Sequence, residues 1–392
     1  MKILVLSAYL PGRGLHGGSS RIYELFHYLH RYHELTLLTF KNRTDDDSRI
    51  QELKRICHKL YVVPMMDRRP FYWYPFEPFI DYHSSEFRSK LQKLLKKEKF
   101  DLVQFEYVQM GVFLPYVTGV PTLLTEHEVN FLSYRKNIPL LNSPIQKIKT
   151  YYNSLQMMKR ELEILRKVDR VICMNQLEAD ALHGYLPVER MTVLPHGVDT
   201  SYFAPMPEIE PEPFAIGFFG AYHHYPNVDA VLHFTEKIFP QIKERVPEAH
   251  FYVIGIHPPP EFDALRKRSD ITVTGFVPDI RPYLARCRVI VAPLRLGLGM
   301  RVKTLEAMAM GKPIVASELA CAGMDLVDGN HAIVANTDES VAESVCYLIQ
   351  DRECSANLGR EARRLVEEKF NYTTIGRQLE QLYHEMGHKT NH

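Results

Sequence analysis

The sequence predicts an α/β protein built from two doubly wound, Rossmann-like domains. Short apolar runs alternate with longer amphipathic stretches, a pattern typical of strands and helices that form a parallel sheet. The pattern occurs in two series, and a proline-rich segment separates them. A length of 392 residues is too great for one compact core and suits two domains of about 200 residues each.

The apolar runs are continuous, which indicates strands that are covered on both faces. The first series comprises Ile3–Leu6, Leu35–Phe40, Leu60–Val63, Leu102–Phe105, Leu123–Thr125 and Val171–Met174. The second series comprises Ile216–Phe219, Phe251–Ile254, Ile271–Thr274, Val289–Ala292, Ile314–Ala316 and Ile333–Val334. Examples of the helical stretches between them are Arg21–Arg31, Ser84–Lys99, Ile145–Arg166 and Val228–Arg245.

A stiff linker is predicted between the two series. Pro205–Pro213 holds four prolines within nine residues, which excludes the interior of a strand or helix. We therefore expect an N-terminal domain over residues 1–204, the linker over 205–213 and a C-terminal domain over 214–370. Ligands of such folds bind at the carboxyl ends of the strands, so a cleft between the domains is the expected site.

The composition excludes several classes of protein. With 24% charged residues and a net charge of +1, the chain shows no excess of basic residues for nucleic acid. The six cysteines lack a Cys-x-x-Cys pair and zinc-ligand spacing, which favours reduced thiols in a cytosolic protein. No run approaches the roughly 20 apolar residues that span a bilayer, and the N-terminal run is too short for a signal peptide. We expect a cytoplasmic protein, and attachment to the inner face of a membrane stays open.

The strongest chemical signal follows the predicted strand Val289–Ala292. Gly297 and Gly299 permit a tight turn and a close approach of the backbone to a ligand. A helix of good helix formers then stops at Gly311, with Pro313 just beyond it. The amides of its first turn and the helix dipole favour an anion. This pattern predicts a phosphate site.

Charged side chains in the same segment strengthen that prediction. Arg301 and Lys303 supply two cations in the first turn, as a diphosphate requires. Glu306 lies about one turn further on and can accept hydrogen bonds from ribose hydroxyls. The alternative is an ordinary loop in which Glu306 merely pairs with Lys303. The segment lacks the third glycine of the NAD fingerprint, which argues against a dehydrogenase.

This segment resembles the retaining glycosyltransferases often called group 1 or family 4, which have the GT-B fold of two Rossmann domains. The resemblance extends over nearly the whole chain. Individual motifs are weak, but their order and spacing carry the assignment. They are Gly17-Gly18-Ser19 with Arg21, Thr125–Asn130, Asp169–Ile172, Leu194–Asp199, Gly275–Pro278 and Phe370–Tyr372.

The resemblance implies a sugar transfer from a nucleoside diphosphate-sugar, with UDP- and GDP-sugars as the candidates, to a glycan, a lipid-linked acceptor or a small molecule. It also implies retention of configuration, no cofactor, no metal, and a C-terminal helix over 371–392 that packs back on the N-terminal domain. The implied catalytic residues are His127, Arg301 and Lys303. The implied donor-binding residues are Gly17, Gly18, Gly220, Val277, Gly297, Gly299, Met300, Arg301, Val302, Lys303 and Glu306.

The implied mechanism assigns separate tasks to these residues. Arg301, Lys303 and the amides of residues 299–302 would stabilise the departing diphosphate. His127 would hydrogen-bond the donor sugar and help to position the acceptor, although a lone histidine is more often structural. The leaving phosphate would take the acceptor's proton after a short-lived oxocarbenium-like ion pair.

The sequence departs from the family pattern at three places. Leu298 stands where the first glutamate of a Glu-x7-Glu motif usually contacts the sugar, and His196 stands in place of an asparagine. The loop Gly220–Asn227 lacks the usual arginine and lysine, whose charge we expect Arg301 and Lys303 to supply. His223 or His224 could assist there, but exposed turn histidines are the simpler interpretation.

Two further segments allow a functional and a plain interpretation. Asp45-Asp46-Asp47 resembles the Asp-x-Asp metal motif of other glycosyltransferases, but its polar surroundings favour a solvated loop. The aromatic segment Phe71–Ile80 precedes a basic helix and could contact an acceptor or an anionic membrane; buried aromatics and a solvated helix face are the alternative. The basic side chains are Arg88, Lys90, Lys93, Lys96, Lys97 and Lys99.

Two other functions stay open on the sequence alone. A non-hydrolysing nucleotide-sugar epimerase has the same fold, although its several acid/base carboxylates are not evident in matching context. A catalytically degenerate nucleotide-sugar-binding subunit is the second alternative, and Leu298 is the observation that suggests it.

Overall fold

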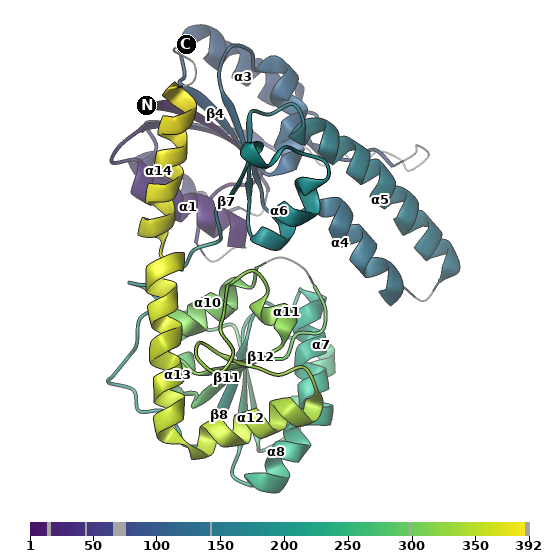
Figure 1. Cartoon of the computed structure of the whole chain (residues 1–392), viewed down its shortest axis with the longest axis vertical. Helices are drawn as coiled ribbons and strands as arrows, with labels where there is room; N and C mark the ends of the chain where they lie inside the picture. The colour runs from purple at the N-terminus through teal and green to yellow at the C-terminus, as the bar shows by residue number, and fades with distance from the viewer. Residues whose placement is uncertain (14–16, 44, 66–75, 142, 298–299, 389–392) are drawn as a thin grey trace. The chain divides into compact units, whose positions relative to one another are not determined.

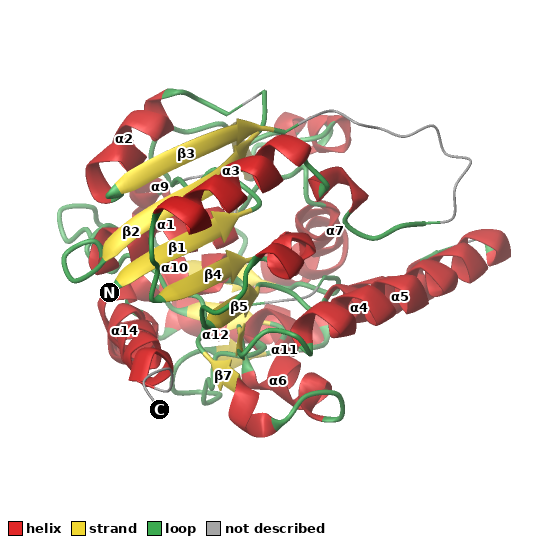
Figure 2. Cartoon of the chain, turned by 90° about the horizontal axis from the view of Figure 1, so that it is seen from above, coloured by secondary structure: helices red, strands yellow, loops and turns green. Residues whose placement is uncertain are grey.

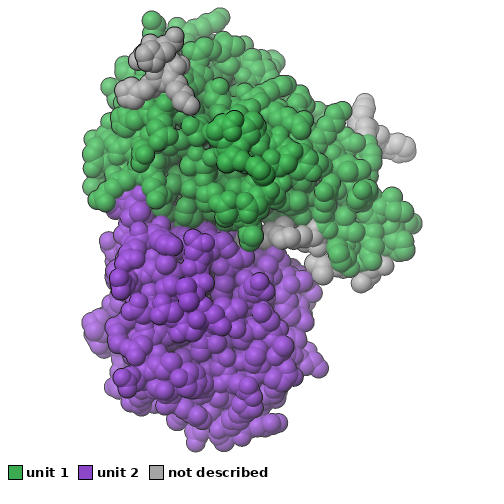
Figure 3. All heavy atoms as spheres, in the orientation of Figure 1, with its two compact units in different colours: residues 1–196, 375–392 green, residues 197–374 purple. Residues whose placement is uncertain are grey.

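The chain forms two compact units, each built around its own parallel sheet (Figures 1 and 3). The computed structural model describes residues 1–13, 17–43, 45–65, 76–141, 143–297 and 300–388. The first unit comprises residues 1–196 and 375–392, and the second comprises 197–374. The predicted α/β class with two Rossmann-like domains is confirmed.

The first unit holds a seven-stranded parallel sheet in the order β3-β2-β1-β4-β5-β6-β7 (Figure 2). Its strands are β1 Lys2–Ser7, β2 Glu34–Lys41, β3 Lys59–Pro64, β4 Leu102–Glu106, β5 Thr122–Glu126, β6 Arg170–Cys173 and β7 Met191–Val193. Its helices are α1 Gly17–Leu29, α2 Ser48–Ile56, α3 Ser85–Lys97, α4 Asn130–Asn137, α5 Pro144–Leu165 and α6 Gln176–His183, with short 3₁₀ turns at Ile80–Tyr82, Val108–Tyr116, Ile138–Leu140 and Val188–Arg190.

The second unit holds a six-stranded parallel sheet in the order β10-β9-β8-β11-β12-β13. Its strands are β8 Ala215–Phe219, β9 His250–Ile254, β10 Ile271–Gly275, β11 Val289–Ala292, β12 Ile314–Ala316 and β13 Ile333–Val334. Its α-helices are α7 Tyr225–His233, α8 Phe239–Arg245, α9 Arg281–Arg286, α10 Val302–Ala309, α11 Glu318–Cys321, α12 Asp338–Gln350 and α13 Arg352–Leu365. Phe234–Ile238 and Val366–Phe370 are π-helical, and Pro260–Asp263 and Leu265–Lys267 form 3₁₀ turns.

Both sheets reverse their strand order beside the first strand of the unit. In the first sheet β1 pairs with β2 on one side and with β4 on the other. In the second sheet β8 pairs with β9 and with β11 in the same way. Open parallel sheets bind ligands outside the carboxyl ends of the strands at such a switch point. The loops after β1, β4, β8 and β11 are therefore where each unit would hold a ligand.

The units divide before the proline-rich segment rather than at it. Phe203, Met206 and Ile209 pack against the core of the second unit, and Glu212 N–H donates to Arg286 C=O at 2.8 Å. These contacts place residues 197–213 in the second unit, whereas the sequence analysis put 197–204 in the first domain and treated 205–213 as a separate linker. The C-terminal helix α14 spans Tyr372–His388, and its residues from Ile375 onward belong to the first unit.

Candidate active site

A nearly buried histidine lies at the carboxyl end of the first unit's central strands. His127 follows β5, and its ring Nε2 lies 2.7 Å from Oε2 of Glu106, the last residue of the neighbouring strand β4. A carboxylate oxygen accepts, so Nε2–H donates and Nδ1 keeps its lone pair. Nδ1 is buried and has no hydrogen-bond partner among the residues that the structure describes. It can accept one hydrogen bond from a ligand hydroxyl.

Burial keeps this histidine neutral. The pKa of His127 is lowered by burial, an effect that Glu106 opposes and the nearby Arg21 charge reinforces. Arg21 on α1 is itself fully buried and donates from Nη2 to the carbonyl of Leu194 at 3.0 Å. A neutral imidazole with a fixed proton on Nε2 suits a positioning hydrogen bond better than repeated proton transfer.

The glycines at the start of α1 lie beside this histidine. Helix α1 begins at Gly17, and a Cβ on Gly18 would meet the Tyr107 hydroxyl and lie 2.9 Å from His127 Nδ1. The Tyr107 ring stacks on the His127 ring with centroids 3.9 Å apart and planes 21° apart. Only glycine leaves room at this position, so the backbone of the loop approaches both rings.

A relay of hydrogen bonds extends from this histidine to the C-terminal helix. Gln104 on β4 donates from Nε2 to Glu106 Oε1 at 2.5 Å. The hydroxyl of Tyr383 on α14 donates to Gln104 Oε1. Tyr383, Gln104 and Glu106 are all buried. None of these three residues was predicted from the sequence; a polar side chain at the end of β4, beside the end of β5, is the signal that could have identified Glu106.

The second unit places its cations at the loop between β11 and α10. Gly297 has a φ of +103°, and a Cβ there would collide with the Arg301 guanidinium. Helix α10 then begins at Val302. Gly297 and Arg301 therefore lie together just before the helix, whereas Leu298 and Gly299 lie outside the described residues.

Lys303 is the centre of this arrangement. Its Nζ donates to Asn227 Oδ1 and lies 4.4 Å from the centroid of the Phe218 ring. A Cβ on Gly220 would lie 2.9 Å from Asn227 Nδ2 and 3.3 Å from Lys303 Nζ. The bare backbone at Gly220 thus allows the loop after β8 to contact the lysine. Asn227 was not predicted as a site residue, although it lies in the loop whose missing charges the sequence analysis noted.

Burial dominates the electrostatics of this cluster. Burial lowers the pKa of Lys303 to about 7, and the adjacent Arg301 charge contributes, while Glu306 opposes the shift. Burial raises the pKa of Glu306 to about 7, against the effect of Lys303. A desolvated lysine beside an arginine becomes more stable when an anion arrives.

The side chains of the other predicted donor residues do not take part in this cluster. Met300 and Val277 have buried side chains in the second core, so only their backbone groups could meet a ligand. Val277 follows the edge strand β10, and its neighbour Phe276 is 73% exposed. His224 directly precedes α7, and its pKa is lowered by burial and then by the charges of His223, Lys303 and Arg301.

The three aspartates Asp45, Asp46 and Asp47 have local partners. Asp45 Oδ2 accepts from the backbone N–H of Asn42 at 2.8 Å, and Asp46 Oδ1 accepts from that of Ser48 at 2.9 Å. Asp47 pairs with Lys41. These contacts order the turn before α2.

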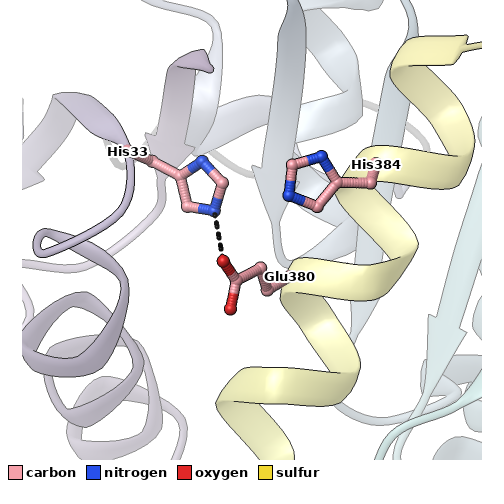
Figure 4. A group of neighbouring side chains, drawn as sticks. All are labelled: His33, Glu380 and His384. Carbon is pink, nitrogen blue, oxygen red and sulfur yellow. Dashed lines mark ion pairs between the residues drawn. The ribbon is translucent and has the colours of Figure 1, made fainter.

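One group of three side chains in the described part of the chain could bring metal-ligand atoms together. Ligand atoms of His33, Glu380 and His384 lie within 4.8 Å of one another, with the last two on α14 (Figure 4). The Met1 ammonium lies 3.4 Å from His33 Nδ1, and an ammonium can only donate. Burial, with the Met1 and His384 charges, lowers the pKa of His33 to about 4. The neutral ring therefore carries its proton on Nε2, 3.9 Å from Glu380 Oε1, and the group joins α14 to the start of the chain.

A cavity of about 830 Å³ lies at the amino ends of strands of the first sheet, opposite the end that carries His127. It lies beside Thr122 and Arg170, where β5 and β6 begin. Asp169 in its wall accepts hydrogen bonds from the backbone N–H and the hydroxyl of Thr122, so its polar groups serve the strand pairing. This cavity is remote from the His127 site within the same unit.

The sequence matches two glycosyltransferase families. Residues 213–351 match the glycosyl transferases group 1, and residues 15–202 match glycosyltransferase family 4. The chain belongs to the group 1 and family 4 glycosyltransferases with the GT-B fold, and it is therefore a transferase.

Individual relatives agree with that assignment. An uncharacterized 44.6 kDa protein in the cps region of Klebsiella pneumoniae is 20% identical over 94% of this chain and 96% of its own. The Escherichia coli UDP-Gal:alpha-D-GlcNAc-diphosphoundecaprenol alpha-1,3-galactosyltransferase is 26% identical over 63% of both chains. The crystal structure of Anabaena HepE in complex with UDP superposes with a TM-score of 0.71 and 15% identity, covering 98% of this chain and 100% of HepE.

Proposed function

We propose that the protein transfers a sugar from a nucleoside diphosphate-sugar, with UDP- and GDP-sugars as the candidates, to a carbohydrate acceptor. One observation carries the proposal: Lys303 is buried beside Arg301, and its ammonium hydrogen-bonds a neutral amide at the carboxyl end of a parallel sheet. Diphosphate is the anion that this cationic site suits best.

The chemistry needs charge stabilisation more than proton transfer. When the bond between the anomeric carbon and the phosphate oxygen breaks, negative charge develops on the leaving diphosphate. Arg301 and Lys303 would stabilise that charge from fixed positions. We propose retention of configuration, with the leaving phosphate accepting the proton of the attacking hydroxyl. His127 Nδ1 would accept a hydrogen bond from a hydroxyl of the donor sugar.

The relatives support the donor class and suggest an acceptor. HepE binds UDP, and another structure of it contains UDP-glucose. The Escherichia coli relative is named for UDP-galactose and a diphosphoundecaprenol-linked acceptor, and the Klebsiella relative is encoded in a cps region. On that basis we propose a role in polysaccharide synthesis in the cytoplasm at the inner face of the membrane, with a lipid-linked glycan as acceptor.

The first test is nucleotide binding. A thermal-shift panel with UDP, GDP, ADP and NAD would compare the wild type with Glu306→Ala. A ligand at 100 times its Kd should stabilise the fold by about 2.7 kcal/mol. We expect one nucleoside diphosphate to stabilise the wild type and the variant to lose most of that shift. A response to NAD alone, or to none of them, would contradict the donor site.

Turnover then separates the three candidate activities. A transferase consumes donor only when acceptor is present, apart from slow hydrolysis. An epimerase interconverts donor sugars without acceptor, and a binding subunit does neither, which is the outcome that Leu298 would favour. Full transfer in excess EDTA would support a metal-independent reaction, whereas loss of activity that manganese restores would overturn it.

A further inference from the structure

The long helix α5 carries a stripe of exposed apolar side chains. Ile145 is 78% exposed and Ile148 is 72% exposed, and the stripe continues through Tyr151, Tyr152 and Leu155. Figure 2 shows α5 projecting with α4 from the body of the first unit. Isolated exposed apolar residues are normal, but five on one helix form a patch that indicates an interaction surface.

The stripe lies on one face of the helix. Ile145, Ile148, Tyr152 and Leu155 follow the spacing i, i+3, i+7 and i+10, which places them along a single line on an α-helix. Ser154, Met157 and Glu161 are buried and point to the opposite side, toward the unit. The helix therefore packs one face against its own unit and exposes a second, apolar face to solvent.

The charged residues of the segment that carries the stripe are all basic. From Val129 to Arg160 the sequence contains six basic residues and no aspartate or glutamate. The six are Arg135, Lys136, Lys147, Lys149, Lys159 and Arg160. Lys147 and Lys149 are exposed and flank the stripe on its two sides. An apolar stripe bordered by cations, with tyrosines among its apolar residues, matches the interface between headgroups and acyl chains of an anionic bilayer.

From this arrangement we infer that α5 docks the protein on an anionic lipid surface, with its stripe inserted among the lipids. A second copy of the chain fits less well. The apolar spacing lasts for two heptads and then reaches Lys159, whereas stable coiled coils need about three to four. Two such helices would also bring like charges together. The docking does not depend on the proposed function, but its use for reaching a lipid-linked acceptor does.

The basic helix α3 lacks the same combination. Phe87, Leu91 and Leu94 are buried, so its apolar face is already used inside the unit. Lys90 lies 5.5 Å from the Tyr61 ring and Arg88 lies 5.7 Å from the Tyr116 ring, both within the same unit. Residues 71–75 of the adjoining aromatic segment lie outside the described residues. Helix α3 therefore serves as the matched control for charge.

The first experiment measures cosedimentation of the full chain with vesicles. Wild type should bind vesicles of phosphatidylglycerol and phosphatidylcholine at least tenfold more tightly than vesicles of phosphatidylcholine alone. The double variant Ile148→Asp with Tyr152→Asp should weaken binding to the anionic vesicles by at least tenfold, because two inserted side chains are lost. Leu177→Asp, which changes a 62% exposed leucine on α6 of the same unit, should bind like wild type.

The second experiment reverses charge. Lys147→Glu with Lys149→Glu should weaken anionic-vesicle binding by at least tenfold, and Lys93→Glu with Lys97→Glu on α3 should have little effect. Each variant must keep the nucleotide thermal shift of the wild type, which separates a failure of docking from a failure of the donor site. Equal binding to neutral and anionic vesicles, or an effect of the α3 pair as large as that of the α5 pair, would overturn the inference. Loss of a dimer in light scattering without any vesicle binding would assign the stripe to a second copy.

Discussion

The two units share a sheet architecture, but the polar groups at their sites differ: a hydrogen-bond network in the first unit and a pair of cations in the second. In the first unit His127, Glu106 and Gln104 form a connected set of hydrogen bonds that fixes the His127 ring and leaves its Nδ1 to accept from a ligand. In the second unit Arg301 and Lys303 gather beside a neutral amide. A connected hydrogen-bond network fixes the orientation of its side chains, and a buried cluster of cations favours binding of an anion. The comparison assigns orientation to the first unit and binding of the diphosphate to the second.

The largest effect should come from the cations of the second unit. Arg301→Ala combined with Lys303→Ala should lower the rate of transfer by about a thousandfold, because preorganised charge opposite the leaving group is lost. Lys267→Ala, an exposed lysine of the same unit, is the control and should keep the wild-type rate. Steady-state donor consumption measures both. A double variant within threefold of wild type would place the phosphate site elsewhere.

Removing the histidine should affect turnover and leave nucleotide binding intact. His127→Ala should lower kcat by about a hundredfold, since a positioned group that contacts the reacting sugar is lost. Its UDP thermal shift should match that of the wild type, whereas the double cation variant should lose the shift. His183→Ala on α6 is an exposed histidine control in the same unit. An active His127→Ala enzyme would remove this residue from the mechanism and with it the proposed division of tasks.

Much of the fold could be predicted from the sequence, because most strands are continuous apolar runs. All twelve apolar runs form strands of the two sheets, since a strand covered on both faces needs uninterrupted apolar residues. Strand β7, Met191–Val193, was not predicted; its three residues are half-buried or exposed, and a threonine stands between the two apolar ones. The limit of the first unit was placed differently from the structure, because the contacts of Phe203 and Met206 with the second core leave no mark on local composition.

The site was predictable only where a local pattern encodes it. Gly297 and Lys303 belong to a turn and helix start that the sequence displays directly. Contacts between segments far apart in the sequence define the roles of Asn227, Glu106 and Tyr383. One example is the hydrogen bond between Tyr383 and Gln104, whose positions are 279 residues apart. Burial decides the pKa of Lys303, and burial is a property of the packed unit. A sequence therefore shows which groups exist at a site and leaves their protonation to the structure.

The pH dependence of donor binding tests the electrostatic half of the comparison. The pKa of Lys303 is lowered to about 7 without ligand, and a bound diphosphate should raise it. Affinity for UDP should therefore be greatest below pH 7 and fall by up to tenfold for each pH unit above it, until the pKa of the complex is reached.

Calorimetry would measure this linkage. Titration of UDP in two buffers with different ionisation enthalpies should show proton uptake on binding near pH 8. Lys303→Arg keeps the positive charge at every pH in this range and should flatten the profile. An unchanged affinity from pH 6 to pH 9 in the wild type would mean that Lys303 is fully charged before the donor binds.

The smallest effect should come from the far end of the hydrogen-bond relay. Tyr383→Phe removes the hydroxyl that donates to Gln104 and keeps the ring, so one buried hydrogen bond is lost. Because Gln104 holds Glu106, and Glu106 holds His127, kcat should fall by about threefold to tenfold while the UDP shift stays unchanged. Tyr347→Phe on α12, an exposed tyrosine, is the matched control.

The pH profile of kcat distinguishes the two roles of Tyr383. A positioning tyrosine should alter that profile along with the rate, because Glu106 acts on the pKa of His127. A tyrosine that only packs would leave both unchanged in Tyr383→Phe, and the relay would then be structural in the first unit rather than part of its site.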